Sequence, residues 1–338
     1  MVKKVTMQDI ADALSISKNS VSQALSGKPG VSSATRKKIE QTAKELGYHY
    51  QPITTKSNPH RTGNIALIAS DFAFSLQSFF GEIYLSIEKE ATSRGLNLLI
   101  QSVTTPAKEN LVLPTFIENK QVDGVLVLSH ISTEYINKII ETGIPTITID
   151  HHHPLIQADA ILTNNRFAAY TAIKHFIDLG HQQIAFVGDT RYSPSYQERL
   201  EGYLLALQEH GLPIQENLIF LTIKESETSV NKLVDSVAEQ PTAWFCVNDG
   251  LGFFVQSSLQ QKGINIPEKA SVCSFDNGKL SKLANPKMTT MDIDLQLYGR
   301  KAIEQLTWRM ENTDEPITEL LLPAKLLKRD STSNVPNN

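Results

Sequence analysis

The 338 residues are 41% hydrophobic, and no apolar run approaches the length of a membrane span, so we expect two or three globular domains with a sizeable buried core. The chain starts without an apolar segment behind a basic residue cluster, which favours a cytoplasmic protein over an exported one. Residues 1–62 hold ten Lys or Arg and four Asp or Glu, a net charge of +6, and because the whole chain carries −4, the remainder carries −10. Such asymmetry is typical of a nucleic-acid-binding module joined to a domain that avoids phosphate, although charged solvated faces are also common.

Residues 5–25 predict two short helices joined by a tight turn. Thr6 is placed to cap the first helix with Asp9 three residues later, and Ser17 is placed to cap the second. Each helix has an apolar stripe that can be buried against the other, formed by Ile10, Ala11 and Leu14 and by Val21, Ala24 and Leu25. The outward face of the second helix keeps short polar side chains and one cation, which is the pattern of a helix that enters the DNA major groove.

A third helix is predicted from the N-cap Ser32 to Leu46, with Gly47 as its stop signal. These three helices carry the patterns V-T-x-x-D-I-A, S-x-x-S-V-S and V-S-x-x-T-R through L-G-Y, and residues 1–50 thereby resemble the helix-turn-helix headpiece of the LacI/GalR (lactose-repressor) family of bacterial regulators. With this resemblance we expect DNA contacts from Thr6, Ser17, Lys18, Asn19, Ser20, Ser22, Gln23, Ser32, Thr35 and Tyr48. In the connector that follows, where the resemblance is weakest, we expect Lys56, His60 and Arg61 to contact phosphates.

Two headpiece residues and the following connector depart from the family pattern. Ser15 stands where the family usually has Gly, so a left-handed residue there carries a side chain at a cost of roughly 1 kcal/mol. Gln23 stands where Arg is frequent. Family members commonly form a hinge helix in the connector, here residues 51–62, and insert a leucine into the minor groove. This connector has no leucine and contains Pro59, so we expect a shortened or absent hinge helix, the alternative being one helical turn with Ile53 in the leucine's place.

From Gly63 onward, strand-like and helix-like segments alternate, which predicts parallel α/β sheets covered on both faces. About 230 residues of this pattern exceed one ordinary sheet, so we expect two lobes, and the pattern resembles the doubly wound, periplasmic-binding-protein-like core of the same family. The strands are expected at 64–69, 97–103, 124–128, 145–149, 184–187, 244–247, 271–275 and 288–291, and helices at stretches such as 79–91, 167–179, 197–210 and 251–262. The core should span 63–338, with lobe 1 at about 63–160 and 291–322, lobe 2 at about 161–290 and a C-terminal segment at 323–338, and with chain crossings near 161, 290 and 322.

Several polar residues at expected strand or helix ends match the family's effector-binding positions. The segment Gln197–Tyr203 resembles its R-x-x-G-Y signature and places Arg199 where a planar guanidinium can bind hydroxyls or a carboxylate. Asp249 is expected to be the N-cap of a helix that starts at Gly250. Thr163–Asn165 has lost the carboxylate that the family usually keeps there. The expected effector site comprises Asp71, Phe72, Phe79, Asp150, Arg199, Asn248 and Asp276, which favours a neutral polyhydroxylated ligand, most readily a sugar, with a nucleobase or phosphorylated sugar as alternatives.

Other residue patterns do not indicate catalysis or a cofactor. His151–His153 is a run of three histidines, but consecutive residues of an extended chain point in alternating directions, so a solvated or cleft-edge loop is favoured over a metal site. Phosphate-binding glycine motifs and a nucleophile elbow are both missing from the sequence, and we expect no enzyme activity, cofactor or metal. Cys246 and Cys273 lie in apolar strand-like runs and are expected to be buried thiols.

Two functions remain compatible with a two-lobed core, a ligand-controlled transcription regulator and a sugar-binding transport receptor. A receptor would need an export signal and would lack the basic headpiece, so the residues favour the regulator. The expected protein is a repressor of carbohydrate-utilisation genes that binds near-palindromic operator DNA as a homodimer and takes a sugar between its lobes.

Overall fold

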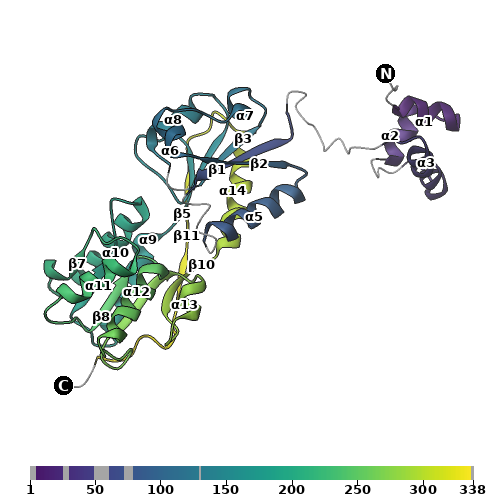
Figure 1. The fold of residues 1–338 in the computed structure, drawn as a ribbon. Coiled ribbons are helices and arrows are strands. Elements are labelled where there is room, and N and C mark those ends of the chain that lie inside the picture. Colours follow the sequence, from purple (N-terminus) through teal and green to yellow (C-terminus); the bar gives the residue numbers. More distant parts are fainter. Residues whose placement is uncertain (1–4, 26–29, 49–60, 72–78, 129–130, 336–338) are drawn as a thin grey trace. The chain divides into compact units, whose positions relative to one another are not determined.

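The computed structural model describes residues 5–25, 30–48, 61–71, 79–128 and 131–335, and the chain divides into two compact units, 1–61 and 62–338 (Figure 1). The first unit contains three helices, α1 (Met7–Leu14), α2 (Lys18–Leu25) and α3 (Ser33–Glu45). Their caps form as predicted, because the Thr6 hydroxyl accepts from the Asp9 amide while the Asp9 carboxylate accepts from the Thr6 amide. The apolar stripes meet in one small core of Ile10, Ala11, Val21, Ala24, Ile39 and Ala43.

The turn between α1 and α2 has the predicted left-handed residue. Ser15 has φ 52° and ψ 43°, and its amide donates to Asp12, while the Ile16 amide donates to Ala11. The third helix uses glycine for the same purpose, because Gly47 follows its C-terminus at φ +73°. A side chain at a left-handed position is therefore tolerated once in this unit.

The second unit contains two six-stranded sheets, each covered by helices on both faces (Figure 1). The first sheet has the order β11-β5-β4-β3-β1-β2, and we call it and its helices lobe 1. The second has the order β12-β10-β9-β8-β6-β7 and defines lobe 2. All paired neighbours are parallel except β12, which runs antiparallel to β10 at the edge of lobe 2. The strands are β1 (Asn64–Ser70), β2 (Asn97–Val103), β3 (Gly124–Leu128), β4 (Thr146–Ile149), β5 (Asp159–Thr163), β6 (Ile184–Val187), β7 (Ile219–Phe220), β8 (Ala243–Cys246), β9 (Ser271–Asp276), β10 (Thr289–Ile293), β11 (Glu319–Leu322) and β12 (Ala324–Leu327).

Helices follow most strands and bury apolar faces on the sheets. In lobe 1, α14 packs along α5 and against β3, β4 and β5, whereas in lobe 2 α9 packs along α10. The helices of this unit are α5 (Phe80–Ser93), α6 (Thr105–Glu109), α7 (Thr115–Glu118), α8 (Thr133–Ile140), α9 (Asn165–Asp178), α10 (Pro194–Glu209), α11 (Glu227–Ser236), α12 (Asp249–Gln261), α13 (Lys279–Leu283) and α14 (Leu295–Arg309), with a short 3₁₀ turn at Glu216–Leu218.

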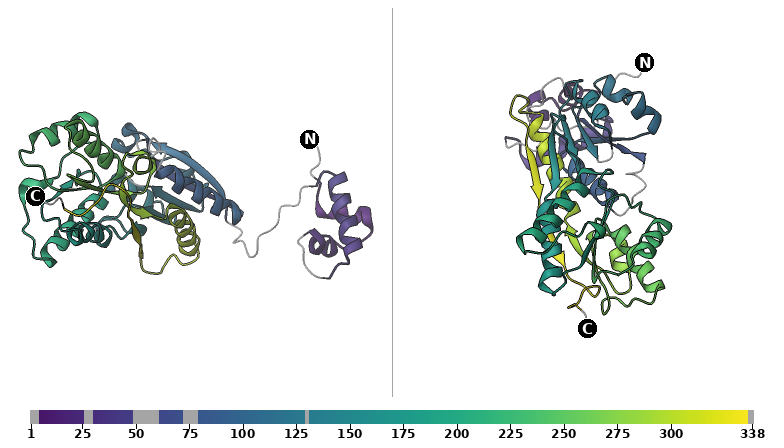
Figure 2. Two further views of the ribbon diagram at one scale, coloured as in Figure 1. Left: turned by 90° about the horizontal axis from the view of Figure 1, so that it is seen from below. Right: turned by 90° about the vertical axis from the view of Figure 1, so that its left-hand side faces the viewer.

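The chain passes between the lobes three times, after Thr163, after Ile293 and after Leu322. The last passage joins β11 and β12, the yellow strands that run from one lobe into the other in Figure 2. The predicted two-sheet α/β class is confirmed. Cys246 and Cys273 are both free and fully buried, as predicted. Among the described residues, no helix is long and apolar enough to cross a membrane.

Candidate functional site

The N-terminus of α2 presents the polar side chains expected to contact DNA. The Ser17 hydroxyl accepts from the Ser20 amide at 3.0 Å and lies 2.8 Å from the Ser20 hydroxyl, so it caps the helix as predicted. Ser17, Lys18 and Asn19 are exposed, whereas Ser22 and Gln23 are partly buried. The Gln23 amide lies against the loop before α3, since a Cβ built on Gly30 would come within 3.2 Å of its Oε1.

The other expected DNA-binding residues occupy different places in the first unit. The Ser32 hydroxyl caps α3 by accepting from the Thr35 amide at 3.2 Å, and Tyr48 packs against the headpiece core. Arg61 is exposed at the last residue of this unit, and Lys56 and His60 lie outside the described residues. Ser17, Lys18 and Asn19 thus form an exposed helix end, and the base contacts expected of α2 stay a prediction.

A cavity of about 430 Å³ contains five of the seven predicted effector residues, namely Phe79, Asp150, Arg199, Asn248 and Asp276. Phe79 and Asp150 come from lobe 1, whereas the other three come from lobe 2, so the cavity lies between the lobes. Asp71 lines an adjoining cavity of about 730 Å³, which shares Tyr192 and Ser193 with the first, so its role in effector binding stays a prediction. Phe72 lies outside the described residues.

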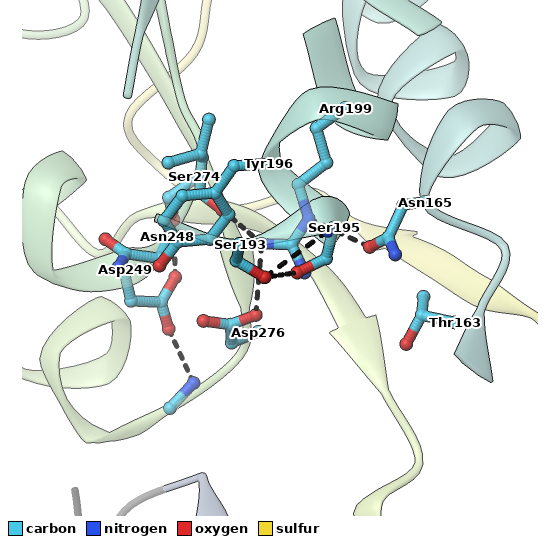
Figure 3. A network of polar contacts seen from close by, with 12 residues as sticks. Thr163, Asn165, Ser193, Ser195, Tyr196, Arg199, Asn248, Asp249, Ser274 and Asp276 are labelled. Atoms are coloured by element: carbon cyan, nitrogen blue, oxygen red, sulfur yellow. Dashed lines mark hydrogen bonds and ion pairs between the residues drawn. The ribbon is translucent and has the colours of Figure 1, made fainter. Parts of the chain in front are cut away.

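Arg199 is buried to 2% exposure and is held from several sides (Figure 3). Its Nε donates to Asn165 Oδ1 at 2.9 Å, and Nη1 donates to the carbonyl of Val247. The guanidinium lies over the Phe275 ring, with Cζ 3.6 Å from the ring centroid, and Nη1 is 3.6 Å from Asp276 Oδ1. These contacts fix a planar group of donors at the cavity wall.

Two aspartates follow central strands of the two lobes in left-handed backbone conformations. Asp150 comes after β4 with φ 54°, and Asp276 ends β9 with φ 103°. Left-handed conformations of residues other than glycine cost of order 1 to 3 kcal/mol and concentrate at functional sites. Burial raises the pKa of Asp150 to about 7 and that of Asp276 to about 8, although the nearby Arg199 charge opposes both shifts.

Asn248, not Asp249, is the N-cap of α12, which corrects the prediction. The Asn248 side-chain oxygen accepts from the Leu251 amide at 2.8 Å, and its Nδ2 reaches Tyr196 at 2.7 Å and Glu225 at 2.6 Å. Asp249 instead points to the sheet, where it accepts hydrogen bonds from side-chain and backbone donors of Ser274, Thr290 and Gly278. The helix starts one residue earlier than predicted because the asparagine oxygen, one position back, already satisfies a helix-end amide.

Two cavity residues, Tyr196 and Glu225, and one residue that holds Arg199 from behind the cavity wall, Asn165, were not predicted. Tyr196 precedes Arg199 by three residues, so helical spacing puts both on one face of α10. Asn165 stands in the segment that had lost its carboxylate, and it replaces that charge with hydrogen bonds to Arg199 and Glu198. Glu225 carries no sequence signal, because its carboxylate reaches the site from a loop over Gly250, where a Cβ would lie 1.8 Å from its Oε1.

The three histidines of residues 151–153 do not converge on one point. Within the described ranges, no group of three or more His, Cys, Asp or Glu side chains is arranged to hold an ion. His152 faces two glutamates, His151 lines the larger cavity and His153 accepts from the Leu155 amide at 3.2 Å. The three rings therefore diverge.

Comparisons with known proteins match both units. A family model for bacterial regulatory proteins of the lacI family matches residues 6–51, and a model for a periplasmic binding protein-like domain matches residues 173–332. The HTH-type transcriptional regulator DegA of Bacillus subtilis is 30% identical over 341 residues, with 98% of each chain covered. The chain belongs to the lacI family of bacterial regulatory proteins.

Solved structures of family members share this lacI-family architecture. A complex described as transcriptional regulator CelR with cellobiose superimposes with a TM-score of 0.73 and 25% identity, covering 97% of this chain and 99% of that one. The lac repressor dimer bound to operator and the anti-inducer ONPF has a TM-score of 0.77 over 98% and 100% of the chains, at 21% identity, and supports the fold alone. This lacI-family chain is accordingly a DNA-binding transcription regulator and not an enzyme.

Proposed function

We propose that this regulator is a cytoplasmic repressor of carbohydrate-utilisation genes, that it binds near-palindromic operator DNA as a homodimer, and that a neutral sugar in the interlobe cavity controls it. The observation that carries the proposal is that Arg199 shares the cavity wall with two carboxyl groups. Its Nη1 is 3.6 Å from Asp276 Oδ1, and its charge acts on the pKa of Asp150. Donors and acceptors that alternate in this way suit neighbouring hydroxyl groups of one molecule.

The cavity chemistry favours a neutral ligand over an anion. Arg199 already donates to Asn165 and Val247 and faces Asp276, so its charge is largely compensated. An added phosphate would also lie near the Asp150 and Asp276 carboxyl groups. Lys224 and Lys279 also line the cavity, so a phosphorylated sugar is retained as an outcome of the test.

Aromatic rings supply the apolar part of the site. Phe79 belongs to lobe 1, and Tyr192 and Tyr196 belong to lobe 2, with the two tyrosine rings stacked 6.5 Å apart. Aromatic faces pack against the C–H surfaces of sugar rings and equally against flat nucleobases. The comparison with CelR, whose structure is named for its cellobiose complex, adds support for the sugar.

The DNA-binding half of the proposal depends on the small size of the headpiece. One helix of eight residues presents few base contacts, so specific binding calls for two headpieces on symmetric half-sites. The effector acts only by binding one lobe arrangement better than another, which then changes how the two headpieces engage the operator.

A thermal-shift panel on the full chain tests the ligand class. Cellobiose, ribose, glucose 6-phosphate, adenine and hypoxanthine are compared, because a ligand at 100 times its dissociation constant adds roughly 2.7 kcal/mol to the free energy of unfolding. We expect a neutral sugar to raise Tm in the wild type and in Arg166→Ala, which removes an exposed arginine of α9, but not in Arg199→Ala. Stabilisation by a nucleobase alone would overturn the sugar assignment, and stabilisation by the phosphorylated sugar alone would overturn the neutral ligand.

A further inference from the structure

His152 connects the two lobes through its imidazole ring. It lies just beyond β4 in lobe 1, two residues after Asp150. Its Nε2 is 2.9 Å from Glu198 Oε1, on α10 of lobe 2, and its Nδ1 is 2.9 Å from Glu319 Oε1, at the start of β11 in lobe 1. One ring nitrogen therefore faces its own lobe and the other faces the opposite lobe.

The positions of the two glutamates determine the charge of the ring. A neutral imidazole has one N–H and can donate to one carboxylate, whereas the imidazolium donates from both nitrogens. The hydrogen bond to Glu198 is the largest cause that raises the pKa of His152, to about 9, with burial opposing it and Glu319 adding to it. His152 is consequently cationic at neutral pH, and the link between the lobes is an ion pair.

The same glutamate continues the network to the effector arginine. Glu198 Oε2 accepts from Asn165 Nδ2 at 2.8 Å, and Asn165 Oδ1 accepts from Arg199 Nε at 2.9 Å. Three hydrogen bonds thus join a lobe 1 side chain to the guanidinium that lines the cavity. A rotation of lobe 1 that displaces His152 changes what holds Glu198, and Glu198 helps to hold Asn165.

We propose that His152 and Glu198 are positioning residues, which tie lobe 1 to lobe 2 and orient Arg199 for the effector through Asn165. The consequence for effector binding rests on the proposed function, but the tie between the lobes does not. Lobe separation and the orientation of Arg199 change together when the tie is removed.

The contact of His152 with Glu198, between the lobes, holds the ring more strongly than its contact with Glu319 within lobe 1. His152 and Glu198 side chains are 29% and 21% exposed, whereas Glu319 is 52% exposed, and exposed ion pairs contribute little. The other charged or titratable groups around the ring are Asp150, His151 and His153 of its own segment. We therefore expect Glu198→Gln to change the lobe separation more than Glu319→Gln does.

Lobe separation is measured in the full chain by spin labels at Glu141→Cys on lobe 1 and Gln208→Cys on lobe 2, diluted with unlabelled chain. Both positions are exposed, and the native cysteines are fully buried and will not react. We expect His152→Gln and Glu198→Gln to lengthen or broaden the distance, the double variant to do no more than either single one, and His153→Gln, an exposed neighbour, to change nothing. Raising the pH should lengthen the wild-type distance with a midpoint near 9, but not that of His152→Gln.

Arginine side-chain NMR provides the readout for Arg199 without any ligand. Its Nε–H should exchange slowly in the wild type and in His153→Gln, and at least tenfold faster in Glu198→Gln and His152→Gln. A tie that is merely structural would leave this exchange unchanged. Any of three results would overturn the proposal: unaltered lobe distances in both variants, a wild-type pH midpoint near the ordinary His pKa of 6.5, or unaltered exchange of the Arg199 Nε–H. Failure of every sugar in the thermal-shift panel would overturn only the proposed function.

Discussion

Ser15 shows how a single residue departs from a pattern and still keeps the local fold. Its φ of 52° is the left-handed conformation that glycine adopts more cheaply, and the headpiece uses glycine at the equivalent end of α3, at Gly47. We predict that Ser15→Gly stabilises the first unit by about 0.5 to 1 kcal/mol, the relief of strain being partly offset by the freedom that glycine adds to the unfolded chain.

Hydrogen exchange of the α1 and α2 amides in the full chain measures this change. The matched control is Gly47→Ser, where a Cβ meets no atom within 4 Å, so that only backbone strain differs and the expected effect is destabilising by a similar amount. Slower exchange in Gly47→Ser or faster exchange in Ser15→Gly would contradict the account.

Gln23 is the second departure from the family pattern and bears on DNA sequence preference. A glutamine amide suits the N6 and N7 edge of adenine, whereas arginine suits the O6 and N7 edge of guanine. We predict that Gln23→Arg shifts preference toward guanine at one symmetric pair of operator positions, by roughly 1 to 3 kcal/mol. In vitro selection of operator DNA with the wild type and with Gln23→Arg measures this preference. Identical consensus sites would contradict a contact between residue 23 and a base.

The contribution of the buried Asp150 carboxyl group to the free energy of unfolding depends on pH. Burial raises its pKa from 3.8 to about 7, so the folded chain binds this proton more tightly than the unfolded chain does. Its stabilising contribution is full below about pH 4 and is lost as the pH rises through about 7. Asparagine accepts the left-handed backbone and carries no charge.

We therefore predict that Asp150→Asn raises Tm relative to the wild type by several degrees at pH 8, and by much less at pH 5. Calorimetric scans at both values test it, with the exposed Asp314→Asn as the control for loss of one charge. An equal Tm difference at the two pH values would mean that the Asp150 carboxyl does not titrate as the structure requires.

At the scale of elements, some strands were predicted with the correct ends and others were missed. The ends predicted for β2, β3 and β6 match the structure. β3 and β6 are runs of apolar or small residues, whereas β2 mixes apolar residues with Gln101 and Ser102. By contrast, β7, β11 and β12 were not predicted. Each lies at the edge of its sheet and is only partly buried, so pairing with the neighbouring strand outweighs local pattern.

The candidate effector residues divide in the same way. Motif or strand position marks Arg199 and Asp276, which line the cavity and whose role in effector binding stays a prediction. The positions of Glu225 and of the hydrogen-bonded Asn165 depend instead on how distant segments pack. The N-cap of α12 was misplaced by one residue, because Asn248 and Asp249 are equally good capping residues and only the sheet contacts of Asp249 distinguish them.

Two buried histidines of lobe 2 hydrogen-bond to residues 328–335 of the C-terminal segment. His181 Nε2 donates to the carbonyl of Ser333 while Nδ1 faces the Thr242 hydroxyl, and His175 Nε2 faces the Thr332 hydroxyl. Burial lowers the pKa of both rings, that of His175 to about 4 with help from the Lys328 charge. Their stabilising contribution is present above about pH 6.5 and is lost as the pH falls toward 4.

We predict that acid loosens this segment before the rest of lobe 2. Hydrogen exchange, corrected for the intrinsic pH dependence of amide exchange, should show residues 328–335 losing protection between pH 6.5 and 4.5 while β8 and β9 stay protected. His210→Gln, which removes an exposed histidine of lobe 2 away from the segment, serves as the control. Uniform loss of protection across lobe 2 would contradict the assignment.

On the scale of the whole molecule, a basic DNA-binding unit is followed by an acidic two-lobed core with a cavity lined by both lobes. The lacI-family architecture follows from the sequence because it depends on motifs and on repeated β/α units. The identity of the effector cannot be predicted from the sequence, because many small molecules suit a cavity of this size. The side chains that line the cavity with Arg199 also come from both lobes and several loops.

The central claim is that the occupant of the cavity controls DNA binding through Arg199. It is tested most directly by fluorescence anisotropy of the full chain on its selected operator, with and without the sugar that stabilises it in the thermal-shift panel. We predict that the sugar changes the operator Kd of the wild type and of Arg166→Ala by at least about fivefold, and that it leaves the Kd of Arg199→Ala unchanged. A sugar that binds the wild type and does not alter its operator Kd would contradict the account.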